Sequence, residues 1–150
     1  MTDSGIYIVL ATFNGERFIR EQIDSIQAQS ERDWTLLVSD DGSRDSTEEI
    51  VARLARQDSR IVLLPRRSGP PGHVANFEYL LKRASEVKAR NIFLADQDDT
   101  WEPAKLQTIT AAVRSSSGRT LGVFSDLELV TADGKPQGSY LGRAGLAGMY

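Results

Sequence analysis

The chain alternates between short apolar runs and longer segments whose apolar residues recur at helical spacing. Apolar runs, most of them rich in β-branched residues, predict strands at 6–10, 34–38, 61–64, 92–95, 121–124 and 127–130. Apolar residues three or four positions apart predict a first helix over 16–29 and further helices beginning near Ser46, Gly72 and Pro103. The pattern therefore predicts strands that alternate with helices over most of the chain.

Two of these helices carry more detailed signals. Ser46 followed by Glu49 has the spacing of a capping box, so we expect a helix to begin there with both side chains bonded to backbone amides. In the helix after Gly72, we expect four side chains to face the core: Val74, Phe77, Leu81 and Ala84.

Strand-helix alternation with nearly continuous apolar strands predicts an α/β fold, a mostly parallel sheet with helices on both faces. In such sheets, ligands bind beyond the carboxyl ends of the strands. Polar motifs follow four predicted strands at this edge, at 12–16, 40–43, 96–99 and Asp126. We therefore expect one binding site assembled from several loops.

Composition narrows the class of protein. The chain has 150 residues, 40% of them apolar, which predicts a globular domain with its own core. A net charge of −3 gives no basic footprint for nucleic acid, and the lack of cysteine excludes disulfides and thiolate metal sites. We find no signal peptide at the start and no apolar run of about 20 residues, so we expect a cytoplasmic protein without a membrane span.

The last thirteen residues differ from the rest of the chain. They are interrupted by glycines and carry no strong apolar period, which is typical of weak order. We therefore expect one domain over 1–137 and a weakly ordered tail over 138–150.

The most informative stretch follows the predicted strand at 92–95. Asp96, Asp98 and Asp99 place three carboxylates within four residues, and like charges this close repel unless a cation lies between them. Asp96 and Asp98 are two positions apart, so an extended chain lets both turn toward one point. Mg²⁺ prefers such oxygen ligands and keeps positions open for phosphate oxygens. The stretch predicts metal-assisted handling of a phosphorylated ligand.

Both acidic motifs have alternative interpretations. The sequence from Asp40 to Ser43 is typical of a turn, although its place directly after a buried strand favours contact with a base or ribose. The stretch from Asp96 to Thr100 also fits the Asp-x-Asp-x-Thr pattern of aspartate-nucleophile phosphatases. That motif resembles one carried on a first strand, whereas three predicted strands precede it here.

The loop over 66–72 is a weaker candidate for diphosphate binding. Its two prolines remove two amide donors, which favours a shaped loop over a phosphate cradle. Arg66 and Arg67 could reach phosphates, but arginines are more often at the surface. His73 is the sole histidine of the sequence, so a capping or packing role is favoured over metal ligation. Trp101 is interpreted as a core or half-core residue, with a place in a pocket wall beside the acids as the alternative.

Three ordered motifs resemble those of family 2 glycosyltransferases. They are the stretches at 11–16, 38–47 and 95–101, and the run at 124–135 is similar to the rhamnosyltransferase-like branch. The resemblance extends from Ile6 to about Gly138. It implies the GT-A fold, the Rossmann-like fold of nucleotide-diphospho-sugar transferases.

The resemblance also implies roles for individual residues. Asp40 would accept the N3–H of uracil or thymine, and Asp96 with Asp98 would form the Asp-x-Asp motif that holds Mn²⁺ or Mg²⁺. The metal would neutralise charge on the leaving nucleoside diphosphate. The full set of implied nucleotide-binding residues is Thr12, Phe13, Asn14, Glu16, Asp40, Asp41, Asn76 and Asp96.

The implied activity is transfer, with inversion, of a sugar from a UDP- or dTDP-sugar donor to a saccharide or lipid-linked acceptor in polysaccharide biosynthesis. Family members are commonly longer, so we expect the chain to be an N-terminal donor-binding portion, with attachment to the inner face of the membrane through other parts. The catalytic base is unassigned, with Asp126 and Asp99 as candidates. The alternative is a nucleotide-sugar-binding module without catalysis.

Overall fold

The computed structural model describes residues 5–115, 123, 125–131 and 135–140. The chain divides into two compact units, residues 1–108 and 109–150, and helix α4 (Lys105–Ser115) begins in the first and ends in the second. None of the helices in the described ranges is both long enough and apolar enough to span a bilayer.

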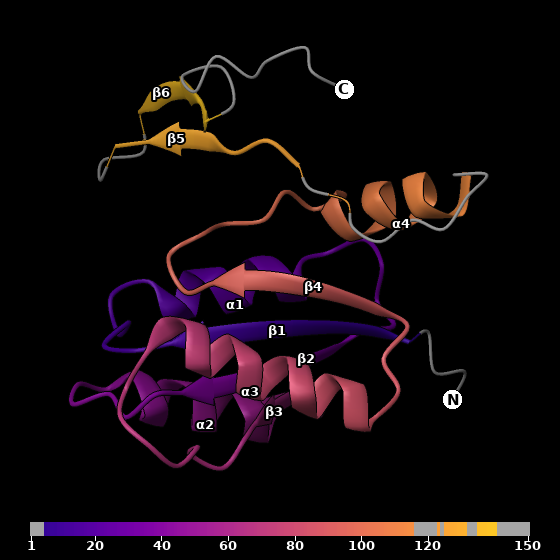
Figure 1. The fold of residues 1–150 in the computed structure, drawn as a ribbon. Coiled ribbons are helices and arrows are strands. Elements are labelled where there is room, and N and C mark those ends of the chain that lie inside the picture. The colour runs from indigo at the N-terminus through magenta and orange to yellow at the C-terminus, as the bar shows by residue number, and fades with distance from the viewer. Residues whose placement is uncertain (1–4, 116–122, 124, 132–134, 141–150) are drawn as a thin grey trace. The chain divides into compact units, whose positions relative to one another are not determined.

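The first unit is built on a four-stranded parallel sheet with the order β3-β2-β1-β4 (Figure 1). Its strands are β1 (Ile6–Thr12), β2 (Thr35–Asp40), β3 (Ile61–Leu63) and β4 (Asn91–Asp96). The helices between them are α1 (Ile19–Gln27), α2 (Thr47–Gln57) and α3 (His73–Glu86). The predicted parallel α/β architecture is confirmed.

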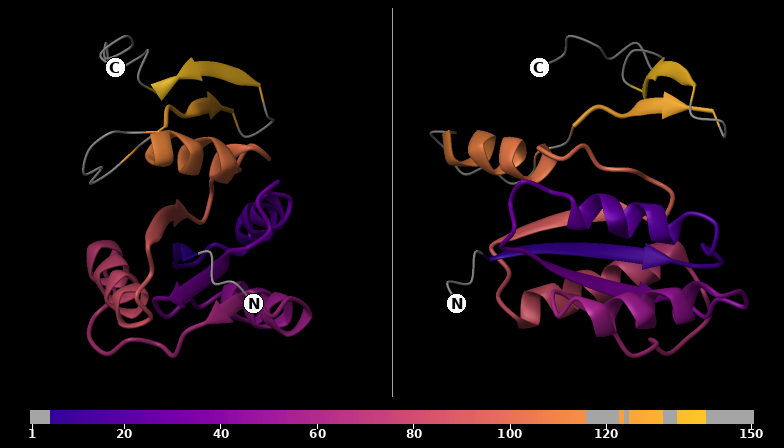
Figure 2. Two further views of the ribbon diagram at one scale, coloured as in Figure 1. Left: turned by 90° about the vertical axis from the view of Figure 1, so that its right-hand side faces the viewer. Right: turned by 180° about the vertical axis from the view of Figure 1, so that it is seen from behind.

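Alternation along β1 sends successive side chains into two different cores. Ile8 and Leu10 pack with α1 and α2 on one face, whereas Val9 and Ala11 pack with α3 on the other. The two views of Figure 2 show these helices on opposite sides of the sheet. Because both faces are covered, β1 is buried along nearly its whole length, as its continuous apolar sequence predicted.

The strand register brings three polar loops to one edge of the sheet. Thr12 at the end of β1 pairs with Asp40 of β2, and Ala11 pairs with Asp96 of β4. The carboxyl ends of these three strands are therefore level with one another. The loops that follow them share the edge at which ligands bind in parallel sheets.

Two local predictions are wrong. Ser46 precedes α2 but makes no side-chain cap, because Asp45 accepts the backbone N–H of Thr47 instead and Ser46 donates its own N–H to Glu16. The expected inner face of α3 is wrong at two of its four positions, whereas Ala84 is buried and Phe77 is partly buried against the core, as expected. Val74 is 71% exposed and Leu81 is 39% exposed, while the buried residues of this helix are Asn76, Leu80 and Ala84.

The second unit contains a two-stranded antiparallel sheet of β5 (Glu128–Val130) and β6 (Pro136–Ser139). The strand predicted at 127–130 is present as β5, and β6 was not predicted. Gly138 and Ser139, placed in the expected tail, lie in β6. The strand predicted at 121–124 and most of the tail, 141–150, lie outside the described residues.

Asp58 links three elements of the first unit and provides a stability test. Its carboxylate accepts Arg60 Nη2 (2.7 Å) and Gln27 Nε2 (2.8 Å), and the hydrogen bonds from Arg60 hold the pKa of Asp58 below its usual value. Asp58→Asn should therefore lower the free energy of unfolding by about 1–3 kcal/mol at pH 7.

A lowered pKa means that this stabilisation is present above the unfolded-state pKa of about 4 and is lost as the pH falls below it. Urea denaturation at pH 7 and at pH 2.5 should show a large difference between wild type and variant at the first pH and a smaller one at the second. Asp24→Asn is the matched control, because its pair with Arg20 is half exposed (50% and 54%) and worth about 0–1 kcal/mol. An equal loss in both variants would contradict the assignment.

Candidate functional site

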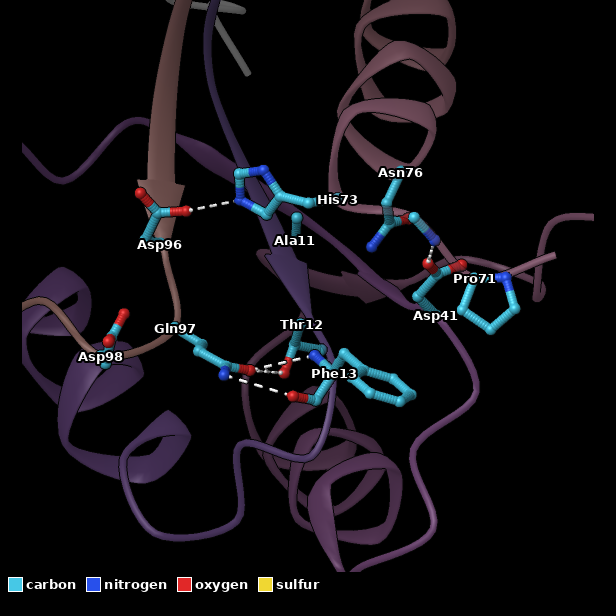
Figure 3. Close-up of a pocket in the computed structure, with 11 residues that line it drawn as sticks. Ala11, Thr12, Phe13, Asp41, Pro71, His73, Asn76, Asp96, Gln97 and Asp98 are labelled. Atoms are coloured by element: carbon cyan, nitrogen blue, oxygen red, sulfur yellow. Dashed lines mark hydrogen bonds and ion pairs between the residues drawn. The ribbon is translucent and has the colours of Figure 1, made fainter.

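A pocket of about 410 Å³ opens at the carboxyl ends of β1, β2 and β4 (Figure 3). This volume lies in the range of small-molecule sites. Eleven residues from the ends of these strands, the loops after them and the start of α3 line the pocket: Ala11, Thr12, Phe13, Asp41, Pro71, Gly72, His73, Asn76, Asp96, Gln97 and Asp98. Six of these were predicted site residues.

Asp41 forms one wall of the pocket and is paired with a buried arginine. The side chains of Asp41 and Arg67 are 7% and 8% exposed, and Arg67 Nε lies 2.8 Å from Asp41 Oδ1. Arg67 Nη2 donates to Asp41 Oδ2 at 3.0 Å, and the backbone N–H of Gly72 donates to the same oxygen (2.5 Å). The expectation of a surface position is therefore wrong for Arg67, which holds the carboxylate in one orientation.

Asp40 faces its own loop and does not line the pocket. Its Oδ1 accepts the backbone N–H groups of Gly42 (2.9 Å) and Ser43 (2.8 Å), and its Oδ2 accepts the Ser43 hydroxyl. Gly42 has a φ of +89°, a conformation that favours glycine. Three donors thus occupy the Asp40 carboxylate, which shapes the turn that presents Asp41.

Asn14 and Glu16 also lie beside the pocket and not in its lining. The Asn14 side chain accepts the backbone N–H of Arg44 (2.9 Å), and Glu16 accepts the backbone N–H of Ser46 (3.0 Å). Both residues therefore join the loop after β1 to the loop after β2. They support the two loops that carry Phe13 and Asp41.

Asn76 is the buried polar residue that α3 contributes to the pocket. It is 1% exposed, and its Nδ2 donates to the backbone oxygen of Ser39 (2.9 Å). Its Oδ1 has no hydrogen-bond partner within the described part of the chain. A buried acceptor without a partner is costly, so a ligand donor at this wall would be favoured.

The acidic end of β4 forms the pocket wall opposite Asp41. Asp96 is half exposed, and its Oδ1 lies 3.2 Å from Nε2 of His73, whose side chain is 69% exposed. Burial, together with the nearby charges of Asp96 and Asp98, raises the pKa of Asp99, and Lys105 opposes this shift. The cluster is therefore a site of concentrated negative charge, as the sequence predicted.

Within the described ranges, no three or more acidic, histidine or cysteine side chains are grouped so as to hold a metal ion. Asp96 and Asp98 supply hard carboxylate oxygens at the open edge of the pocket. This donor set fits a cation such as Mg²⁺ that takes its remaining ligands from phosphate oxygens and water.

The two candidate bases fall in different units. Asp99 is half buried directly after the acidic motif, and it does not line the pocket. Asp126 belongs to the second unit, where its Oδ1 accepts the backbone N–H of Leu127 (2.8 Å). Trp101 is buried in the core, as predicted.

Five lining residues were missed by the sequence: Ala11, Pro71, Gly72, His73 and Gln97. Pro71 and Gly72 belong to the Gly-Pro-Pro-Gly loop, whose interpretation as a shaped loop agrees with their position. A pocket role for His73 was indicated only by its place directly after that loop. No role was expected for Gln97, whose side chain contacts the end of β1 and the loop after it.

Comparisons with known proteins agree with the predicted family. The model of the family described as "Glycosyl transferase family 2" matches residues 7–118. The chain is 34% identical over 99 residues to dTDP-rhamnosyl transferase RfbG of Shigella flexneri. This alignment covers 65% of this chain and 34% of that protein. It is 36% identical over 107 residues to WfgD of Escherichia coli, a UDP-Glc:alpha-D-GlcNAc-diphosphoundecaprenol beta-1,3-glucosyltransferase, which covers 71% of this chain and 40% of that protein.

Solved structures share the fold. S. aureus TarS 1–349 in complex with UDP-GlcNAc aligns with a TM-score of 0.58 at 21% identity, over 86% of this chain and 41% of that one. The mannosyltransferase PcManGT of Pyrobaculum calidifontis, in complex with GDP-Man and Mn²⁺, aligns with a TM-score of 0.58 at 24% identity, over 83% and 35%. The predicted GT-A fold is confirmed. The chain spans well under half the length of these proteins.

Proposed function

The chain belongs to glycosyl transferase family 2, and we propose that its pocket binds a pyrimidine nucleoside-diphospho-sugar as the donor for sugar transfer. The observation that carries the proposal is the arrangement of the pocket. A fixed carboxylate, Asp41, stands on one wall and the exposed pair Asp96 and Asp98 on the other. This membership leaves the phosphatase alternative without support.

Asp41 is the group we assign to the nucleobase, in place of Asp40. The Asp40 carboxylate is occupied by its own turn, whereas Asp41 lines the pocket with its orientation set by Arg67. A carboxylate there would accept the N3–H of uracil or thymine. Phe13, 44% exposed in the pocket lining, offers an aromatic surface for the ring.

Asp96 and Asp98 are the residues that would hold the divalent cation. When bound, Mn²⁺ or Mg²⁺ supplies Lewis-acid stabilisation of the charge on the departing diphosphate. The chain's own contribution is to place two carboxylates at the pocket edge and to hold the nucleoside between the β1 and β2 loops. Without a cation, these carboxylates would repel the diphosphate.

The acceptor and the stereochemistry belong to the same proposal. We assign inverting transfer to a saccharide or lipid-linked acceptor, which requires a carboxylate to deprotonate the acceptor hydroxyl. The names of two relatives, a dTDP-rhamnosyl transferase and a glucosyltransferase acting on a diphosphoundecaprenol-linked sugar, support the donor class and the lipid-linked acceptor. Asp99 and Asp126 are the residues of this chain to substitute first in a search for that base.

A nucleotide screen in the presence of Mn²⁺ tests the proposed donor. UDP and dTDP are expected to bind at least about tenfold more tightly than ADP and GDP, because a purine places its N–H groups farther from the ribose than N3 of a pyrimidine. Isothermal titration calorimetry with the four diphosphates measures this order. Tighter binding of GDP than of UDP would contradict the assignment of Asp41 to a pyrimidine.

A further inference from the structure

We propose that Gln97 is a positioning residue that couples cation binding at Asp96 and Asp98 to nucleotide binding at the loop after β1. The inference rests on the proposed donor function. It assigns a role in donor binding to a residue that does not itself need to contact the nucleobase or the cation. Gln97 stands between the two carboxylates in sequence, and its side chain reaches the opposite loop, as Figure 3 shows.

Three hydrogen bonds join Gln97 to the last residue of β1 and to the loop after it, across more than 80 positions of sequence. Its Oε1 accepts the Thr12 hydroxyl (2.7 Å) and the backbone N–H of Phe13 (3.0 Å). Its Nε2 lies within hydrogen-bonding distance of the Phe13 carbonyl oxygen (3.3 Å), to which it donates. The side-chain amide thus pairs with both backbone groups of Phe13, and a glutamine fits this donor-acceptor pattern where a carboxylate would not.

The Gln97 side chain fits against the loop because position 15 is a glycine and has no side chain. A Cβ added to Gly15 would lie 2.3 Å from Gln97 Oε1 and 3.0 Å from Thr12 Oγ1. The Gly15 backbone is anchored separately, because its N–H donates to Thr47 Oγ1 (2.8 Å) in a buried contact. The glutamine side chain therefore occupies the space that any larger residue at position 15 would take.

These contacts connect the two parts of the donor site: the carboxylates that would bind the cation and the residues that would bind the nucleoside. Fixing the Gln97 side chain fixes the backbone from which Asp96 and Asp98 project. The same contacts fix Thr12 and Phe13 on the nucleoside side of the pocket. Once the contacts are removed, each half can still form, but cation binding no longer orders the nucleotide loop, so the two ligands become less cooperative.

The experiment measures the ratio of UDP dissociation constants in EDTA and in saturating Mn²⁺, for wild type and variants, by calorimetry. Gln97→Ala should reduce this ratio by about fivefold to tenfold, the effect of losing about one net hydrogen bond of coupling. Gln107→Ala is the matched control, because that exposed glutamine accepts the Ser30 hydroxyl and lies outside the pocket lining. Its ratio should equal that of the wild type.

Gly15→Ala provides a second variant in which the glutamine remains but is displaced by the new methyl group. Alone, it should lower the ratio as much as Gln97→Ala does. When Gly15→Ala is combined with Gln97→Ala, it should lower the ratio little further, because the glutamine atoms that the new methyl group would displace are absent. A purely structural role for Gln97 would instead lower thermal stability while leaving the ratio unchanged.

The outcomes separate the inference from the function on which it rests. A wild-type protein that binds UDP no better in Mn²⁺ than in EDTA would overturn the proposed function, and the inference with it. A wild-type ratio that persists in both Gln97→Ala and Gly15→Ala would overturn the inference alone. A ratio that falls in both single variants, and falls no further in the double variant, is the result expected.

Discussion

Replacing Asp41 with alanine is expected to lower the free energy of unfolding by about 3–5 kcal/mol, because it leaves the buried guanidinium of Arg67 without its carboxylate. Both side chains are less than a tenth exposed, so water cannot replace the lost partner. The Gly72 amide loses its acceptor as well. Urea denaturation followed by circular dichroism measures the loss, and UDP affinity should fall in any folded fraction.

Two control variants test whether the loss of stability comes from leaving a buried charge unpaired. Glu86→Ala breaks the exposed pair between Arg83 and Glu86, 45% and 46% exposed, and should cost no more than about 1 kcal/mol. The double variant Asp41→Leu with Arg67→Met removes both charges and should recover much of the stability, though not UDP binding. A loss below about 1 kcal/mol for Asp41→Ala would show that the pair is not buried as described.

The second large effect is expected at the metal motif. Asp98→Asn should reduce the gain in UDP affinity that Mn²⁺ produces by about tenfold or more, because loss of even an outer partner of a metal site costs about that much. Stability should change by no more than about 0.5 kcal/mol, because Asp98 is exposed and its removal relieves repulsion with Asp96 and Asp99. Calorimetry with and without Mn²⁺ measures the first quantity and thermal denaturation the second.

Glu102→Gln is the matched control for this prediction. Glu102 is an exposed acid close to the motif in sequence, and it lies outside the pocket lining. Its substitution removes the same charge without removing an oxygen ligand from the pocket edge. Equal losses of Mn²⁺ dependence in the two variants would mean that general negative charge, and not ligation by Asp98, produces the effect.

Much of the fold could be predicted because the spacing of apolar residues along the sequence indicates which faces of strands and helices are buried. The runs at β1 and β2 are apolar on both faces, a pattern typical of a parallel sheet covered on both sides. Two of the four inner positions expected for α3, Val74 and Leu81, are exposed, whereas the polar residue Asn76 is buried. It is buried because its side-chain amide bonds Ser39 at the end of β2, which a pattern of polarity does not reveal.

The composition of the site could be predicted better than its geometry. The sequence placed Asp40 and Asp41 at the pocket together, but only the strand register and the turn decide that Asp40 turns back on Gly42 and that Asp41 lines the cavity. The partner of Asp41, Arg67, lies 26 positions away and was interpreted as a surface residue. The contacts of Gln97 span 84 and 85 positions, and no local signal indicates them.

Cation-dependent binding of a nucleotide-sugar donor is tested most directly by titration of UDP into the wild-type protein, first in saturating Mn²⁺ and then in EDTA. Binding in Mn²⁺ is expected to weaken by at least about tenfold when the cation is removed, because Asp96 and Asp98 would then repel the diphosphate. No binding in Mn²⁺, or the same affinity in both solutions, would contradict the assignment of this pocket to a cation-dependent nucleotide-sugar donor.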